Sequence, residues 1–84
     1  MGEMLLELEQ CISKAKYLLS LIDKNRVSKL TISDINRIDI LLEAYINEII
    51  YLSASSISYM WVDSYFDIKK HVLEIITILE RELK

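Results

Sequence analysis

Three stretches of this chain repeat apolar residues at alternating spacings of three and four, and no other feature restricts its folding as strongly. Such a heptad pattern draws one continuous apolar seam along one side of an α-helix. The chain has no proline and only one glycine, so few positions favour breaking a helix. The pattern predicts helices over residues 3–24, 32–53 and 57–83, packed as an all-α, three-helix antiparallel bundle. The seam residues are Leu5, Leu8, Ile12, Ala15, Leu19 and Ile22 in the first stretch, Ile35, Ile38, Leu42, Tyr45, Ile49 and Leu52 in the second, and Trp61, Tyr65, Ile68, Val72, Ile75 and Leu79 in the third.

Capping residues mark the boundary between the first two helices. Thr31 is suited to the N-cap position, with Asp34 at the third helical position. Leu30 and Ile35 occupy the places of a hydrophobic staple, which closes the entry into a helix. Asn25 opens a short polar link and is suited to the left-handed conformation that ends many helices. A link this short favours an antiparallel helix pair.

A break in phase separates the second and third stretches. Continuing the second seam would bring Asp63 onto it, whereas the observed third seam is displaced from that register by two residues. Neither a three-residue nor a four-residue insertion produces such a shift. Four serines gather between residues 53 and 58, and serine competes with the helical backbone while capping new helices well. We therefore predict a turn at residues 53–57 within a single helical domain covering residues 1–84.

Each predicted helix carries more apolar surface than one contact can bury. This surplus predicts association, first as a homodimer and then with another protein. The alternatives are that these are isolated surface hydrophobes, or that the third helix lies centrally between the other two. Tyrosine and tryptophan crowd the turn before the third helix, and the first interpretation is that they fill the core. Because burial is hard to complete near a helix start, we also predict a partner-binding surface or a small apolar pocket there. The candidate interface residues are Leu6, Tyr17 and Leu21 in the first helix, Ile40, Ala44 and Tyr51 in the second, and Tyr59, Trp61 and Phe66 at the aromatic end, while Val62, Leu73 and Ile76 widen the apolar sector of the third helix.

Residues able to carry catalysis are few. The single histidine, His71, and the single cysteine, Cys11, lie in different helices, so the sequence offers no nucleophile beside a base. One side of the third helix carries four residues of the kinds that bind metals, namely Asp63, Asp67, His71 and Glu74. However, Asp67–His71 and Lys70–Glu74 also have the spacing of ordinary ion pairs on a solvated helix. We therefore predict no catalytic, cofactor-binding or metal-binding residues, and a protein that is not an enzyme.

Positive charge gathers in residues 24–37, which hold four basic residues and one acidic residue although the whole chain has a net charge of −3. A symmetric dimer would duplicate this end into a patch able to meet phosphates. Such a dimer resembles, in architecture alone, the small antiparallel helical-hairpin dimers that regulate plasmid RNA. The simpler explanation is that cations near a helix C-terminus complement its dipole. The alternative function is thus a small dimeric nucleic-acid-binding regulator that uses Lys24, Arg26, Lys29 and Arg37.

The chain offers no sign of a membrane or secreted protein. Its longest uncharged stretch, residues 49–62, is shorter than the roughly 20 residues that span a bilayer. A single cysteine cannot form an internal disulfide, and the chain does not begin with the basic and apolar regions of a secretion signal. We expect a cytoplasmic protein with no membrane span. The isoleucine-rich composition, which indicates an AT-biased source, suits a phage or mobile-element accessory protein.

Overall fold

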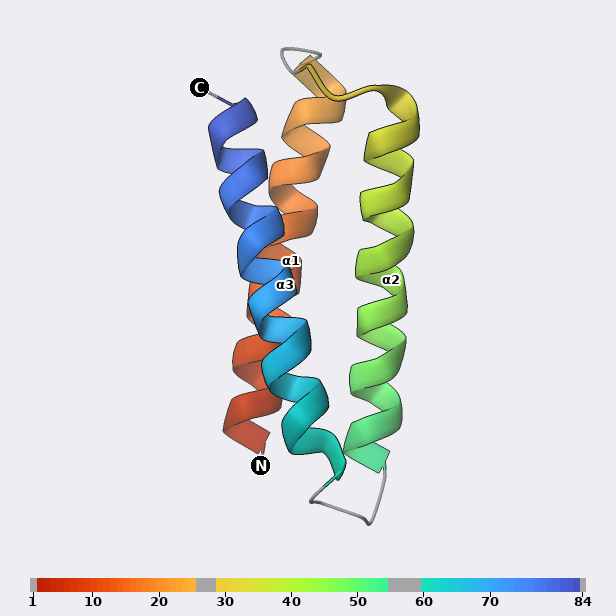
Figure 1. The fold of residues 1–84 in the computed structure, drawn as a ribbon, viewed down its shortest axis with the longest axis vertical. Coiled ribbons are helices and arrows are strands. Elements are labelled where there is room, and N and C mark those ends of the chain that lie inside the picture. Colours follow the sequence, from red (N-terminus) through yellow and green to blue (C-terminus); the bar gives the residue numbers. More distant parts are fainter. Residues whose placement is uncertain (1, 26–28, 55–59, 84) are drawn as a thin grey trace.

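The computed structural model describes residues 2–25, 29–54 and 60–83, with side chains described at 5–23, 29–51 and 64–83. Its helices are α1 (Gly2–Asn25), α2 (Ile32–Ala54) and α3 (Met60–Glu82). They lie side by side in an elongated bundle of 43 × 19 × 16 Å. The first and third helices run in the same direction and α2 runs opposite to both (Figure 1). The predicted all-α, three-helix antiparallel bundle is confirmed.

Reciprocal hydrogen bonds fix the start of α2. The backbone N–H of Asp34 donates to Oγ1 of Thr31 at 3.1 Å, and the N–H of Thr31 donates to Oδ2 of Asp34 at 3.0 Å. Together they satisfy donors that the first turn of a helix otherwise leaves unpaired. Leu30 and Ile35 are both half-buried against the core, as expected of a staple. The predicted N-cap is confirmed.

The ends of the helices differ slightly from the prediction. The first helix ends at Asn25, one residue beyond the predicted end. The second continues to Ala54, so Ser53 and Ala54 are helical although the turn was predicted to begin at residue 53. The helix propensity of serine is only a few tenths of a kcal/mol poorer than average, so an established helix continues through it. The rest of the predicted turn and the predicted start of the third helix at residue 57 lie outside the described residues.

The core is built from the predicted seams and, among the described side chains, contains no buried polar group. Five of the six seam residues of α1 are buried and the sixth, Leu5, is half-buried. All the described seam residues of α3 are buried, and Ile76 joins them. In α2 only Leu42 and Ile49 are buried, while its other described seam residues are half-buried. The apolar spacing therefore identified the correct face of each helix, but the three faces are not covered equally.

The unequal burial follows from the arrangement of the helices. The first helix packs extensively against both α2 and α3, whereas α2 and α3 contact each other at few points. The two diverge towards the N-terminal end of α2 and the C-terminal end of α3 (Figure 1). The central helix is thus α1, and the alternative of a central third helix is wrong. The wide face of α3 is covered at Ile76 but leaves Phe66 and Leu73 exposed.

The polar links between helices lie at the surface. An ion pair joins Lys16 of α1 to Glu43 of α2. On the other side of α1, Nζ of Lys69 lies 3.4 Å from Oε1 of Glu7. Exposed pairs of this kind contribute little to stability because water screens them and their side chains lose entropy. The apolar core therefore dominates the stability of the bundle.

Candidate interaction surfaces

The outer face of α2 carries an uncharged stripe of exposed residues. Ile40, Ala44, Asn47 and Tyr51 follow spacings of four, three and four, and we call them the α2 outer stripe. All four are exposed, with Ile40 at 68% and Tyr51 at 72% of their full accessible area. The exposure of Ile40 is unusual, because isoleucine is among the most often buried residue types. Around the helix, Arg37, Glu43 and Glu48 flank this stripe at about 50–70° from its centre, and the other charged residues of α2 lie farther away. The predicted stripe Ile40, Ala44 and Tyr51 is therefore found together on the surface, with Asn47 completing it.

The outer face of α1 offers a weaker stripe. Leu6 and Tyr17 are exposed, but Leu21, which was predicted to join them, is half-buried. Leu6 and Tyr17 are eleven residues apart, which is about 17 Å along a helix. The polar residues Gln10 and Lys14 are exposed between them. These positions are scattered hydrophobes rather than a continuous apolar surface.

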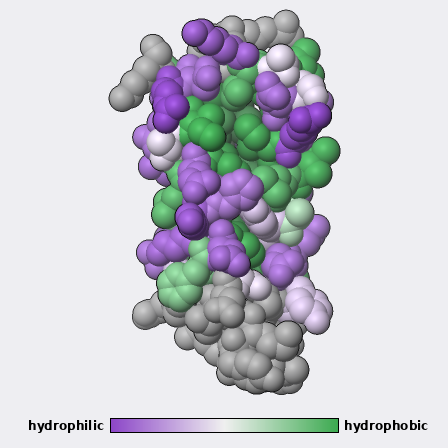
Figure 2. All heavy atoms as spheres, in the orientation of Figure 1, coloured by the Kyte–Doolittle hydropathy of each residue, from purple (hydrophilic) through white to green (hydrophobic). Residues whose placement is uncertain are grey.

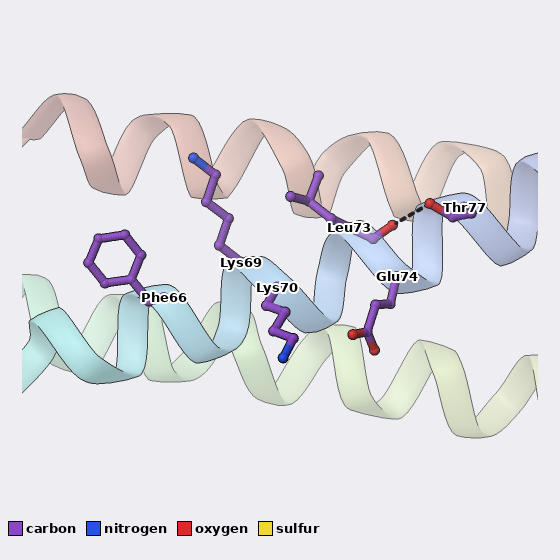
Figure 3. A pocket seen from close by; sticks show the side chains of 6 residues that line it. All are labelled: Phe66, Lys69, Lys70, Leu73, Glu74 and Thr77. Carbon is purple, nitrogen blue, oxygen red and sulfur yellow. Dashed lines mark hydrogen bonds between the residues drawn. The ribbon is translucent and has the colours of Figure 1, made fainter.

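The exposed side of α3 is hollowed. Among the described residues, six of α3 line a trough of about 500 Å³, which is an open surface feature rather than an enclosed cavity. Lys69 reaches towards α1, while Lys70 and Glu74 point towards α2 (Figure 3). These six described residues are Phe66, Lys69, Lys70, Leu73, Glu74 and Thr77.

Lys69 forms the α1 side of this trough. Its ammonium group donates to Oη of Tyr65 at 3.2 Å and lies 5.5 Å from the centre of that ring. The hydrogen bond with Tyr65, and more weakly the charge of Glu7, raise the pKa of Lys69 against the opposing effect of burial. The lysine therefore stays protonated at neutral pH. Phe66 packs edge-on against Tyr65, with ring centroids 5.2 Å apart, yet remains exposed, which leaves it available to a partner.

Apolar surface also gathers where α2 and α3 diverge. Figure 2 shows apolar side chains there, in the upper part of the view, bordered by hydrophilic ones. Ile78 is exposed on α3 and Leu41 is half-buried on α2. Nearer the middle of the bundle, the side chains of Tyr45 and His71 are in contact and link α2 to α3. Their rings meet at 74° with centroids 5.7 Å apart, and Oη of Tyr45 is hydrogen-bonded to Nδ1 of His71.

The Tyr45–His71 contact gives the only histidine a structural partner. Burial raises the pKa of Tyr45, so its phenol keeps the proton that it can donate to Nδ1 of His71. The sequence placed Tyr45 on the seam of its helix and His71 beside Asp67, and it gave no signal that the two rings would meet. Only the packing angle between α2 and α3 brings them together.

The basic end of the bundle is less basic than residues 24–37 alone. Lys29 and Arg37 are exposed, while the side chains of Lys24 and Arg26 lie outside the described residues. The backbone N–H of Lys29 donates to Oε2 of Glu82 at 3.1 Å, which brings the acidic end of α3 beside the basic segment. Phosphate binding requires an excess of positive charge. The carboxylate of Glu82 reduces that excess.

A second carboxylate lies within the basic segment. The backbone and hydroxyl hydrogen bonds of Thr31, and more weakly the charge of Arg37, lower the pKa of Asp34. Asp34 is therefore negative at neutral pH, where it offsets the charge of Arg37.

The aromatic end can be described only in part. Tyr59 lies outside the described residues. Trp61 belongs to α3, but its side chain, like that of Val62, is not among those described. Of the three aromatic candidates, Phe66 alone is placed, in the trough of α3.

The described side chains include one cysteine and one histidine. No group of three or more His, Cys, Asp or Glu among them is arranged to hold a metal ion. Cys11 is half-buried and its thiol is free. None of the helices, over the residues described, is long and apolar enough to cross a membrane. Neither the family models, nor the curated proteins, nor the solved structures compared with this chain match it.

Proposed function

We propose that the protein is a non-enzymatic helical protein–protein interaction module that acts as a homodimer. One observation supports this most: a fully apolar core coexists with nine large apolar side chains left exposed on the described helices. Burying such side chains against another chain removes apolar surface from water, which is the main driving force of association. No group of three or more His, Cys, Asp or Glu that could hold a metal ion accompanies them in the described residues.

In this proposal, two surfaces of different character bind different partners. The uncharged α2 outer stripe suits the homodimer interface, because homodimer interfaces are more apolar than the rest of a protein surface. The trough of α3 combines Phe66 and Leu73 with the charged heads of Lys69, Lys70 and Glu74, a mixture typical of a surface that meets a different protein. In this proposal the dimer works in the cytoplasm as an adaptor or regulatory accessory protein.

Sedimentation velocity over a range from about 1 to 200 µM tests the proposal. We expect the weight-average sedimentation coefficient to rise from that of a monomer to that of a dimer, because the apolar faces associate by mass action. A monomer that persists at the highest concentration and unfolds cooperatively would remove the homodimer.

A nucleic-acid-binding regulator is the competing function. Labelled duplex and single-stranded probes titrated at low salt discriminate the two, because phosphate contacts are strongest there. Under our proposal, no binding occurs up to tens of micromolar protein. Salt-dependent binding that Arg37→Glu abolishes would favour the competing function, and Glu82→Gln should then strengthen that binding because it removes a carboxylate from the basic end.

A further inference from the structure

The second helix is the one whose apolar surface the monomer fails to cover. It supplies two of the thirteen buried core residues but four of the nine large exposed hydrophobes of the described chain. These four are also among the most exposed, and they are Ile32, Ile40, Ile50 and Tyr51. Association through α2 would therefore remove more exposed apolar surface from water than association through either other helix.

We propose that a second copy of the chain packs against the α2 outer stripe, so that the two α2 helices form an antiparallel pair about a twofold axis. This inference rests on the proposed function and names the surface that performs it. The stripe has the alternating spacing of a coiled-coil seam, with Ile40 and Asn47 at d positions and Ala44 and Tyr51 at a positions. A twofold axis level with the midpoint between Ala44 and Asn47 sets Ile40 opposite Tyr51 of the second copy, and Ala44 opposite Asn47 of the second copy.

The register is complementary in size. The large Tyr51 ring meets the branched Ile40 at both ends of the pair, where aromatic and aliphatic side chains pack well. At the centre, the small Ala44 lets the two backbones approach, and the Asn47 amide fills the space opposite it. One polar residue at such a seam position is a common device for fixing a single register. A parallel pair would instead place Asn47 against Asn47 and Tyr51 against Tyr51.

The register is also free of charge conflict. In an antiparallel pair, the residues on each flank of the seam meet the corresponding flank of the partner. Leu41 then lies near Glu48 of the second copy, and Glu43 lies near Ile50 of the second copy. No carboxylate faces another across the interface, and Glu43 is already paired with Lys16 of its own chain.

The stripe spans eleven residues, or about 17 Å of helix. An interface of this length is shorter than those of standard stable complexes, which bury about 1,200–2,000 Å² in total, and falls among the weak ones. We therefore expect a dissociation constant in the micromolar range.

A matched pair of variants tests which helix forms the interface. Tyr51→Glu in α2 and Tyr17→Glu in α1 make the same change at two exposed tyrosines, at 72% and 62% of full accessibility. We expect Tyr51→Glu to raise the dissociation constant on the order of 100-fold, because each dimer loses both Tyr51–Ile40 contacts and gains two carboxylates. Tyr17→Glu should change it by less than about threefold. Sedimentation velocity measures both constants.

Ala44→Glu checks the same conclusion at the centre of the pair. Because Ala44 is exposed, the monomer should keep its helical circular dichroism, while the dimer should be lost. If both Tyr51→Glu and Ala44→Glu remain dimeric, the proposed surface is wrong. If Tyr17→Glu or Ile78→Glu dissociates the dimer instead, the homodimer stands but uses the outer face of α1 or the opening between α2 and α3.

Pulsed electron paramagnetic resonance tests the register without destabilising the interface. A spin label at Asn36→Cys, in a chain that also carries Cys11→Ala, reports the distance between the two copies. The proposed antiparallel register separates the labels by about 28 Å along the helix axis. A parallel pair would bring them within about 15 Å, because paired helices lie only 8–10 Å apart. Distances near the shorter value would overturn the antiparallel arrangement, and a monomer at every concentration would overturn both this inference and the proposed homodimer.

Discussion

The first and second helices begin from nearly identical apolar patterns and end with different environments. Each has a six-residue seam at alternating spacings of three and four. In α1, five seam residues are buried, whereas in α2 only Leu42 and Ile49 are. The first helix has a neighbour on both flanks of its seam, while α2 contacts mainly α1. A heptad seam therefore says which side of a helix is apolar, and the number of neighbours decides how much of that side is removed from water.

The largest expected effect is a difference in unfolding free energy between isoleucine variants in α1 and in α2. Ile12→Ala in α1 should reduce the free energy of unfolding by about 3 kcal/mol, because a fully buried isoleucine leaves a cavity. Ile38→Ala in α2 should cost about 1 kcal/mol, because the same side chain there is only half-buried. Urea unfolding, monitored by circular dichroism at one fixed protein concentration, measures both.

The conservative pair Ile12→Val and Ile38→Val provides the control if the alanine variant of Ile12 is largely unfolded. We expect about 1 kcal/mol for Ile12→Val and a smaller loss for Ile38→Val. Equal losses at the two positions would show that α2 is covered as fully as α1.

The comparison of α1 with α2 also predicts how readily each helix unfolds locally. At protein concentrations where the chain is monomeric, amide hydrogens in the middle of α2 should exchange about tenfold faster than those in the middle of α1, because fewer buried contacts oppose local opening. At dimeric concentrations the protection of α2 should rise, since its outer stripe is then covered. Mass-spectrometric exchange on peptides from each helix measures this difference, and uniform protection of the two helices at low concentration would contradict it.

The smallest effect concerns the start of α2. Thr31→Ala removes the hydroxyl that accepts the N–H of Asp34 and should cost about 1 kcal/mol in urea unfolding. The lowered pKa of Asp34 adds a dependence on pH. Its charged form stabilises the folded state above the unfolded pKa near 3.8, and this contribution is lost as pH falls through the lower folded value.

Asp34→Asn keeps the side-chain geometry and should flatten this part of the pH profile. For Thr31→Ala, the control is Ser13→Ala, because Ser13 is exposed in the middle of α1 and caps no helix there. An unchanged pH profile in Asp34→Asn would show that the hydrogen bonds to its carboxylate do not contribute to stability.

Local features of the fold could be predicted because they depend on neighbouring residues. The seams, the Thr31 cap and the break between α2 and α3 all follow from spacing or from hydrogen bonds within one turn. The end of α2 was predicted one residue early, because serine disfavours a helix too weakly to stop it. The candidate surface could be predicted in part: Ile40, Ala44 and Tyr51 are exposed together, but Leu21 is half-buried and Ile76 is covered by the bundle.

The sequence by itself determined where the helices form and which face of each is apolar, since both depend on the helical repeat and on side chains a few residues apart. The tertiary structure alone decided that α1 is the central helix and that α2 and α3 diverge, because these depend on the angles at which whole helices pack. It also decided that Tyr45 meets His71 across two helices. The half-burial of the α2 seam arises from that geometry, because a seam with one neighbour remains partly uncovered however regular its spacing. The α2 outer stripe of the proposed dimer lies on the opposite side of the helix, where the helical repeat itself places it.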